Sequence, residues 1–368
     1  MANALQIEPI FTSTSSSSPT ELADLVEYCH GDAVTTPFGR KRAADGHPLP
    51  YRVRFFELGN EQYNTRFVEQ VQAMEARAAT LGLNGTLTYI FPDNGGLRGK
   101  DIDAAKALGI DAQIAADIHV GAGGGLDQAA GLFASRTDFH QSAVNLETNV
   151  GTHTHARALQ EAADLNAFFS APPAMQKRVL VRTASFCTER SGHYDQFDQG
   201  IAFFLPNQTW LQPPGHVHAM IAKSRYLNAR NVSLVAGRTA NRTTAGTSFA
   251  GASLAGGGLS VSAQSSDGEE STVVRIVNPY AAPIGPSGMQ NISVAVTLGK
   301  AMNCGACSVS VLAADSPDMA NPSWAPDLVA PKAAPCALTD ARTVTLAPLL
   351  PFSYSIVEFT GCHKGGTA

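Results

Sequence analysis

Apolar residues in the first 230 positions follow two alternating patterns. Continuous apolar runs are typical of strands buried on both faces of a parallel sheet. Between them, apolar residues recur every three or four positions, which is typical of a helix with one buried face. We predict strands at 5–12, 52–59, 87–92, 114–120, 143–147 and 201–206. We predict helices after the Ser18-Pro19-Thr20-Glu21 start signal and at 64–81, 126–135, 153–170 and 214–227.

Six strand-helix units in a chain of 368 residues favour a (β/α) barrel of the TIM type over a doubly wound sheet. A closed barrel of this type has eight units, so the pattern predicts a partial barrel. We assign residues 1–229 to this α/β domain, as the catalytic domain.

The pattern changes after about residue 230. Helical periodicity stops, and short apolar runs alternate with turns rich in Gly, Pro and Asn, which is typical of a β-sandwich. We therefore assign residues 230–368 to a C-terminal β-sandwich domain. Its predicted strands are 231–236, 259–264, 272–278, 292–297, 307–313, 343–348 and 353–359.

Composition excludes several classes of function. Hydrophobic residues make up 44% of the chain and no run reaches the ~20 apolar residues that span a bilayer, so we expect no membrane partner. A net charge of -5 without a basic cluster argues against nucleic acid. The first residues show no export signal. We expect an extracellular or secretory location if the full-length gene carries one. The sequence leaves open whether the chain forms a homo-oligomer. N-glycosylation triplets occur at Asn84, Asn207, Asn231, Asn241 and Asn291.

Other motifs suggest cofactors or metals, but their contexts argue against them. Cys304 and Cys307 form a C-x-x-C pair without a second pair, so we expect a local disulfide or buried thiols there. The pairs at 153/155 and 216/218 (H-x-H) fall in helical patterns, where alternate side chains diverge. The glycine-rich run 121–125 does not complete a dinucleotide-binding motif. We expect no metal and no cofactor.

Polar residues gather at the ends of the predicted barrel strands. The chemistry of a (β/α) barrel lies at the carboxyl ends of its strands, so these residues are the candidates for a site. They are Asn60-Glu61, Asp93, Asp117-Ile118-His119, Asn145-Leu146-Glu147 and Asn207-Gln208.

Two glutamates at one barrel mouth suit the hydrolysis of a glycosidic bond, because one can donate a proton while the other attacks or activates water. Glu61 and Glu147 are the candidate catalytic pair. Asn60 is placed to bind a sugar hydroxyl and His119 to orient the second carboxylate. Asn207 and Gln208 are the further candidates for substrate binding. Glu57 competes with Glu61 but lies deeper in its strand, where a charge needs a partner.

Several segments resemble glycoside hydrolase family 51, the alpha-L-arabinofuranosidases. Glu57-Leu-Gly-Asn-Glu-Gln-Tyr63 resembles the family's acid/base segment, and Val144-Asn-Leu-Glu147 stands in place of its nucleophile segment. Asp117-Ile-His119 resembles its Asp-x-His strand end. Further similar segments are 25–31, 44–51, 184–187, 321–331 and 349–359.

The resemblance implies a retaining mechanism with Glu61 as general acid/base and Glu147 as nucleophile, acting on arabinose-containing polysaccharides or oligosaccharides. It implies that residues 5–12 match the third barrel strand, so we expect an N-terminally truncated barrel lacking its first strands. The glycine run 121–125 replaces an aromatic residue that the family often carries. The alternative from a different class is a noncatalytic carbohydrate-binding or structural remnant.

Overall fold

The computed structural model describes residues 8–92, 97–118, 142–146, 152–170, 179–182, 200–224, 226, 228–232, 259–279, 292–299 and 302–364. The chain forms two compact units. We call them the α/β unit (Met1–His119, Ala129–Glu147, Lys177–Thr183) and the β-rich unit (Val120–Gln128, Thr148–Gln176, Ala184–Ala368). The β-rich unit begins before the expected domain boundary at residues 229 and 230.

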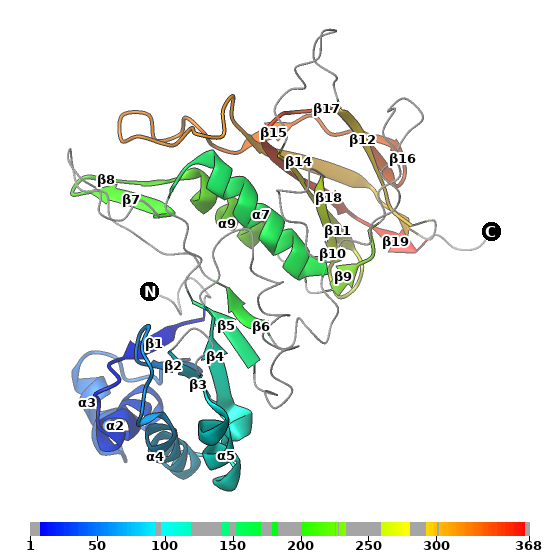
Figure 1. Ribbon diagram of the computed structural model, residues 1–368. Coiled ribbons are helices and arrows are strands. Elements are labelled where there is room, and N and C mark those ends of the chain that lie inside the picture. Colours follow the sequence, from blue (N-terminus) through cyan, green and yellow to red (C-terminus); the bar gives the residue numbers. More distant parts are fainter. Residues whose placement is uncertain are drawn as a thin grey trace. The chain divides into compact units, whose positions relative to one another are not determined.

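A parallel sheet organises the α/β unit (Figure 1). Each strand pairs with the next in chain order. The strands are β1 (Ile10–Ser13), β2 (Phe55–Leu58), β3 (Thr88–Phe91), β4 (Ile114–Asp117), β5 (Ser142–Asn145) and β6 (Val179–Arg182). The first five confirm predicted strands, whereas β6 was not predicted. Within the described residues the sheet is open, with β1 and β6 at its edges.

Helices cover one face of this sheet: α2 (Pro19–His30), α3 (Pro37–Ala44), α4 (Phe67–Thr80) and α5 (Gly99–Ala107). The predicted start signal is confirmed, because Ser18 and Glu21 form a reciprocal capping box at α2. The core between helices and sheet combines strand residues such as Phe56 and Tyr89 with helix residues such as Val71. The opposite face carries a smaller apolar layer of Phe55, Ile90, Ala115 and Val144.

The prediction that residues 201–206 form the sixth barrel strand is wrong. Its residues form β7 (Ala202–Leu205), which pairs antiparallel with β8 (Gln208–Leu211) in a separate two-stranded hairpin. Phe203 and Trp210 face each other across the hairpin and are both buried. A short apolar run does not distinguish a barrel strand from a hairpin strand, since the difference lies in its pairing partner.

The β-rich unit is built around a six-stranded sheet. Its strands, in order across the sheet, are β15 (Lys332–Ala334), β14 (Ala306–Ala313), β18 (Ser353–Thr360), β11 (Ser271–Asn278), β10 (Ser260–Ser265) and β9 (Asn228–Arg230). A three-stranded sheet packs on one face through residues such as Val344 and Leu346. Its strands, in order, are β12 (Ile292–Thr297), β17 (Thr343–Leu349) and β16 (Leu338–Asp340). Helices α7 (His155–Ser170) and α9 (Pro213–Lys223) pack on the other face. The predicted β-sandwich is thus present, and the two helices belong to its core rather than to the parallel sheet (Figure 1).

β10, β11, β12, β14, β17 and β18 lie close to predicted ranges, whereas β9, β15 and β16 were not predicted. Of the predicted strand 231–236, residues 231 and 232 are not in a strand and the others lie outside the described residues. Additional short strands, β13 (Met302–Asn303) and β19 (His363–Lys364), pair with each other.

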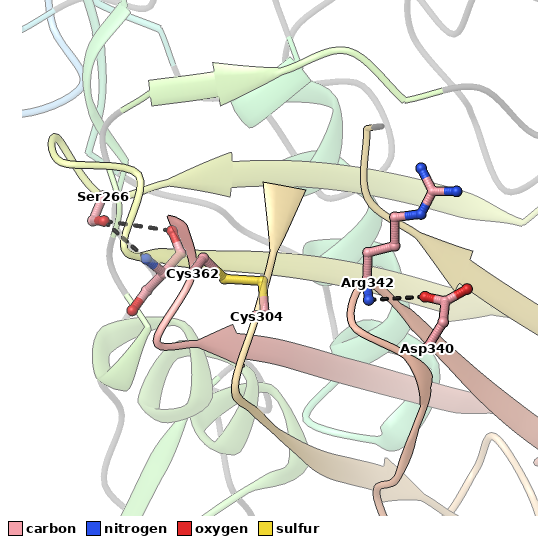
Figure 2. Close-up of a disulfide and its surroundings, with 6 residues drawn as sticks. Ser266, Cys304, Asp340, Arg342 and Cys362 are labelled. Atoms are coloured by element: carbon pink, nitrogen blue, oxygen red, sulfur yellow. Dashed lines mark hydrogen bonds between the residues drawn. A yellow bond between two sulfur atoms is a disulfide. The ribbon is translucent and has the colours of Figure 1, made fainter. Parts of the chain in front are cut away.

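Two disulfides cross-link the sandwich. Cys304 bonds to Cys362, as Figure 2 shows, and Cys307 bonds to Cys336. The expected local disulfide or buried thiols at the C-x-x-C pair are therefore wrong. Cys304 precedes β14 and Cys307 lies within it, and each bonds to a cysteine of a different, later segment.

The loop that follows Asn321 is held tightly against the β7-β8 hairpin. Asn321 is buried, and its Nδ2 donates to the carbonyls of Leu211 and Val329, both at 2.9 Å. Its Oδ1 accepts from the Val329 N–H at 2.7 Å. Its own carbonyl accepts from Trp210 Nε1 at 2.6 Å. The same loop presents Trp324, of which 86% is exposed.

Candidate active site

The carboxyl ends of the parallel strands share one edge of the sheet, and polar residues follow the apolar layer there. Thr12 and Glu57 are neighbours across β1 and β2, and Thr12 Oγ1 donates to Glu57 Oε2 at 2.6 Å. Asp117 ends β4, is fully buried, and accepts from the Leu146 N–H at 3.2 Å. On the face of the sheet opposite the helices, the side chains therefore change from apolar to acidic toward this edge.

The turn after β2 requires an unusual backbone. Gly59 has φ +133°, and a Cβ there would lie 2.8 Å from Pro92 Cγ, so a side chain at this position is excluded on both counts. Glu61 has φ +50°, in the left-handed region that costs a residue with a side chain ~1–2 kcal/mol. Asn60 and Glu61 are both exposed. The turn thus presents an amide and a carboxylate to solvent at the strand end.

A buried pair of amides anchors this turn. Asn64 Nδ2 donates to the Leu58 carbonyl at 2.6 Å and to Gln70 Oε1 at 2.7 Å. Asn64 Oδ1 accepts from the Arg66 N–H at 2.9 Å. Gln70 Nε2 donates to the carbonyls of Ser15, at 3.1 Å, and Ser17, at 2.8 Å. The turn after β2 is therefore joined to the loop after β1.

Tyr63 attaches the same turn to the segment after β3. Its hydroxyl donates to Asp101 Oδ2 at 2.7 Å. The guanidinium carbon of Arg98 lies 3.9 Å from the centre of its ring, which is cation-π contact, and Phe91 packs edge-on against it. Three consecutive strand ends thus meet around Gly59-Asn60-Glu61.

The structure places some of the predicted site residues and not others. Asn60 and Glu61 lie at a strand end of the parallel sheet, as expected. Asp93, His119 and Glu147 lie outside the described residues, although Glu147 follows the last residue of β5 by two positions.

Two predicted substrate-binding residues lie on a different kind of element. Asn207 is in the turn of the β7-β8 hairpin and Gln208 begins β8, so neither ends a strand of the parallel sheet. Gln208 Nε2 donates to the Ser323 carbonyl at 3.0 Å, which holds the loop after Asn321. The expectation that they end a barrel strand is wrong. Glu57, the predicted rival of Glu61, is 3% exposed and accepts from Thr12.

His155 begins α7, and His216 and His218 lie within α9, whereas His153 precedes α7 and packs against Phe203. His155 Nε2 hydrogen-bonds the Phe352 carbonyl at 2.6 Å, and His218 Nε2 lies 3.1 Å from Glu161 Oε2. Burial lowers the pKa of His155 and of His216. No group of three potential metal ligands occurs within the described ranges. In that same portion, no helix is long and apolar enough to cross a bilayer.

Comparison with known families adds a specific observation. Residues 6–107 match the model of the alpha-L-arabinofuranosidase 1 domain. This segment contains β1 to α5, and therefore Gly59-Asn60-Glu61. The chain thus resembles the alpha-L-arabinofuranosidases. No curated protein sequence matches it significantly.

Solved structures of arabinofuranosidases share the fold. The GH51 arabinofuranosidase from Xanthomonas axonopodis pv. citri superposes with a TM-score of 0.66 at 15% identity, over 98% of this chain and 77% of that chain. The arabinose complex from Thermotoga maritima gives 0.65 at 14%, over 97% and 76%. An arabinose-bound GH51 alpha-L-arabinofuranosidase gives 0.69 at 16%, over 98% and 56%.

Sequence reasoning missed the residues that hold the turn after β2. Asn64 and Gln70 were not singled out. The side-chain oxygen of Asn64 accepts from the N–H two residues on, which is a turn contact typical of asparagine. The partners of Gln70 on the loop after β1, Ser15 and Ser17, lie 55 and 53 positions away. Spacing along the chain carries no signal for such a contact.

Proposed function

We propose that this protein is a retaining glycoside hydrolase that releases alpha-L-arabinofuranosyl groups from arabinose-containing polysaccharides or oligosaccharides. The observation that carries the proposal is Glu61, an exposed carboxylate at a parallel strand end, held in a left-handed turn inside the segment that matches the arabinofuranosidase domain. Strained backbone of this kind concentrates at functional sites.

The proposed reaction is a double displacement. Glu147 attacks the anomeric carbon while Glu61 protonates the oxygen of the leaving group, and a glycosyl-enzyme ester forms. Glu61 then removes a proton from water, which attacks the same carbon and releases arabinose with its original configuration. Asn60, beside the acid, binds a sugar hydroxyl, and His119 orients the Glu147 carboxylate.

The sheet sets a geometric condition on this pair. β2 and β5 are separated by β3 and β4, which corresponds to ~14 Å across a flat sheet with ~4.8 Å between strands. A retaining pair needs carboxyl groups about 5–5.5 Å apart. The proposal therefore requires the sheet to curve so that both side chains converge, as the strands of a (β/α) barrel do.

The test uses an aryl alpha-L-arabinofuranoside. We expect hydrolysis by the unmodified protein, loss of it in Glu147→Ala, and partial recovery of that variant with azide, which replaces the missing nucleophile. NMR of the first product should show the retained anomer. Glu69→Gln is the matched control, because Glu69 is an exposed glutamate on α4.

Each contrary result has a distinct meaning. An inverted product excludes double displacement. Binding of arabinose-containing oligosaccharides without any hydrolysis favours the noncatalytic remnant. If azide does not restore hydrolysis to a folded Glu147→Ala variant, Glu147 is not the nucleophile.

We also infer that the protein works in the secretory pathway or outside the cell. The support is the pair of disulfides, since such bonds persist in oxidising compartments and are rare in the cytosol. Detection of the protein in culture medium, with a cytosolic marker absent, tests this location.

A further inference from the structure

The backbone around Glu61 is restrained from a neighbouring strand end. Glu61 itself is exposed. Two residues before it, Gly59 sits against the segments after β1 and β3. A Cβ at Gly59 would lie 3.3 Å from Ser15 Cβ as well as 2.8 Å from Pro92 Cγ. The position of the carboxylate therefore depends on the two neighbouring loops.

Gln70 is the side chain that joins the loop after β1 to the turn after β2. It is fully buried on the first turn of α4, and both ends of its amide are used. Its Nε2 donates to the Ser15 and Ser17 carbonyls, and its Oε1 accepts from Asn64 Nδ2. Asn64, which is 2% exposed, donates in turn to the carbonyl of Leu58, the residue directly before Gly59.

We propose that Gln70 and Asn64 are positioning residues for Glu61, an inference that rests on the proposed function. The two amides act through the backbone and do not touch substrate. They hold the left-handed turn so that the Glu61 carboxyl reaches the leaving-group oxygen. Displacement of a catalytic group by about 1 Å costs on the order of 10²-fold in rate.

The experiment compares two arabinofuranosides that differ in their need for a proton. The leaving group of a 2,4-dinitrophenyl arabinofuranoside departs as a stable anion, whereas that of an unsubstituted phenyl arabinofuranoside needs the general acid. The value of kcat/KM reports the first displacement for both. We expect Gln70→Ala to lower kcat/KM for the phenyl substrate about 10²-fold, and for the dinitrophenyl substrate less than about 5-fold.

Two further variants complete the experiment. Asn64→Ala should show the same selective loss of kcat/KM for the phenyl substrate. Because Asn64 lies in the loop before α4, this variant leaves the packing of the helix unchanged and can be measured even if Gln70→Ala does not fold. Gln72→Ala is the matched control, since Gln72 is a glutamine on the same helix with an exposed side chain. It should leave both values unchanged. Thermal unfolding confirms that each variant is folded.

The outcomes separate this inference from the proposed function. Suppose that the unmodified protein is active. If kcat/KM of the Gln70 and Asn64 variants then falls equally for both substrates, or does not fall, the positioning role is overturned and the proposed glycosidase activity stands. An unmodified protein that hydrolyses neither substrate overturns the proposed function, and the positioning role with it.

Discussion

The hydroxyl of Thr12 on the edge strand β1 donates a hydrogen bond of 2.6 Å to Oε2 of Glu57, a buried residue of β2. Thr12→Val keeps the shape of the side chain and removes this donor. We expect the free energy of unfolding to fall by about 1–3 kcal/mol, because a buried carboxyl oxygen loses a partner. Urea unfolding measures the change. Thr12→Ser should stay near the unmodified value, and Thr65→Val, at an exposed position, should show no comparable loss.

Acid should weaken the β-rich unit through His155. Burial lowers its pKa from the usual value near 6.5, and its buried Nδ1 has no hydrogen-bond partner among the residues that the structure describes. The unfolded chain therefore binds a proton more readily than the folded one. The stabilising effect is complete above about pH 6.5 and is lost as the pH falls below that value toward the lower folded pKa.

His155→Gln tests this origin of the acid sensitivity. Glutamine can still donate to the Phe352 carbonyl but does not titrate. The free energy of unfolding of this variant should decline less steeply between pH 7.5 and pH 5 than that of the unmodified protein. His47→Gln, at an exposed position, should leave the slope unchanged. Equal slopes for His155→Gln and the unmodified protein would contradict the prediction.

Asn321→Ala should be among the more damaging single changes in the β-rich unit. It removes the side-chain partners of the Leu211 and Val329 carbonyls and of the Val329 N–H. Buried backbone groups without partners are costly, so we expect a loss of about 3 kcal/mol in the free energy of unfolding. Denaturant titration checks it. Asn231→Ala, an exposed counterpart, should change stability by less than about 0.5 kcal/mol.

Reduction of the disulfides should destabilise the sandwich. Their partners are 58 and 29 positions apart, and closing such loops restricts the unfolded chain, which is worth about 2–4 kcal/mol for each bond. Thermal unfolding by circular dichroism with and without reductant measures the effect. Replacing Cys304 and Cys362 by serine should cost at least as much as replacing Cys307 and Cys336, because the closed loop is longer. The reverse order would argue against the loop-closure explanation.

Helices and strands with a clear apolar pattern could be predicted from the sequence, whereas α3 could not. Its sequence Pro-Phe-Gly-Arg-Lys-Arg-Ala-Ala lacks an apolar stripe. Arg42 within it is fully buried and donates to the carbonyls of Tyr28, Gly31, His47 and Pro48. This helix is held by an arginine that binds backbone oxygens, and hydrophobic periodicity does not register such a contact.

The candidate site divides in the same way. Asn60 and Glu61 could be predicted because a strand, a glycine and a helix start adjoin them in the chain. Asn207 and Gln208 were misplaced, because the Phe203 strand pairs locally with the Trp210 strand instead of entering the parallel sheet. The role of Gln70 depends on Ser15 and Ser17, and no local pattern encodes that distance.

Both tryptophans of the chain, Trp210 and Trp324, lie in the β-rich unit, one 5% and the other 86% exposed. Indole emission depends on the polarity of the surroundings, so the two will emit at different wavelengths, and a soluble quencher will reach Trp324 first. The α/β unit contains no tryptophan. Selective excitation of indole therefore observes the melting of the β-rich unit alone, and the difference from circular dichroism isolates the unit that carries Glu61.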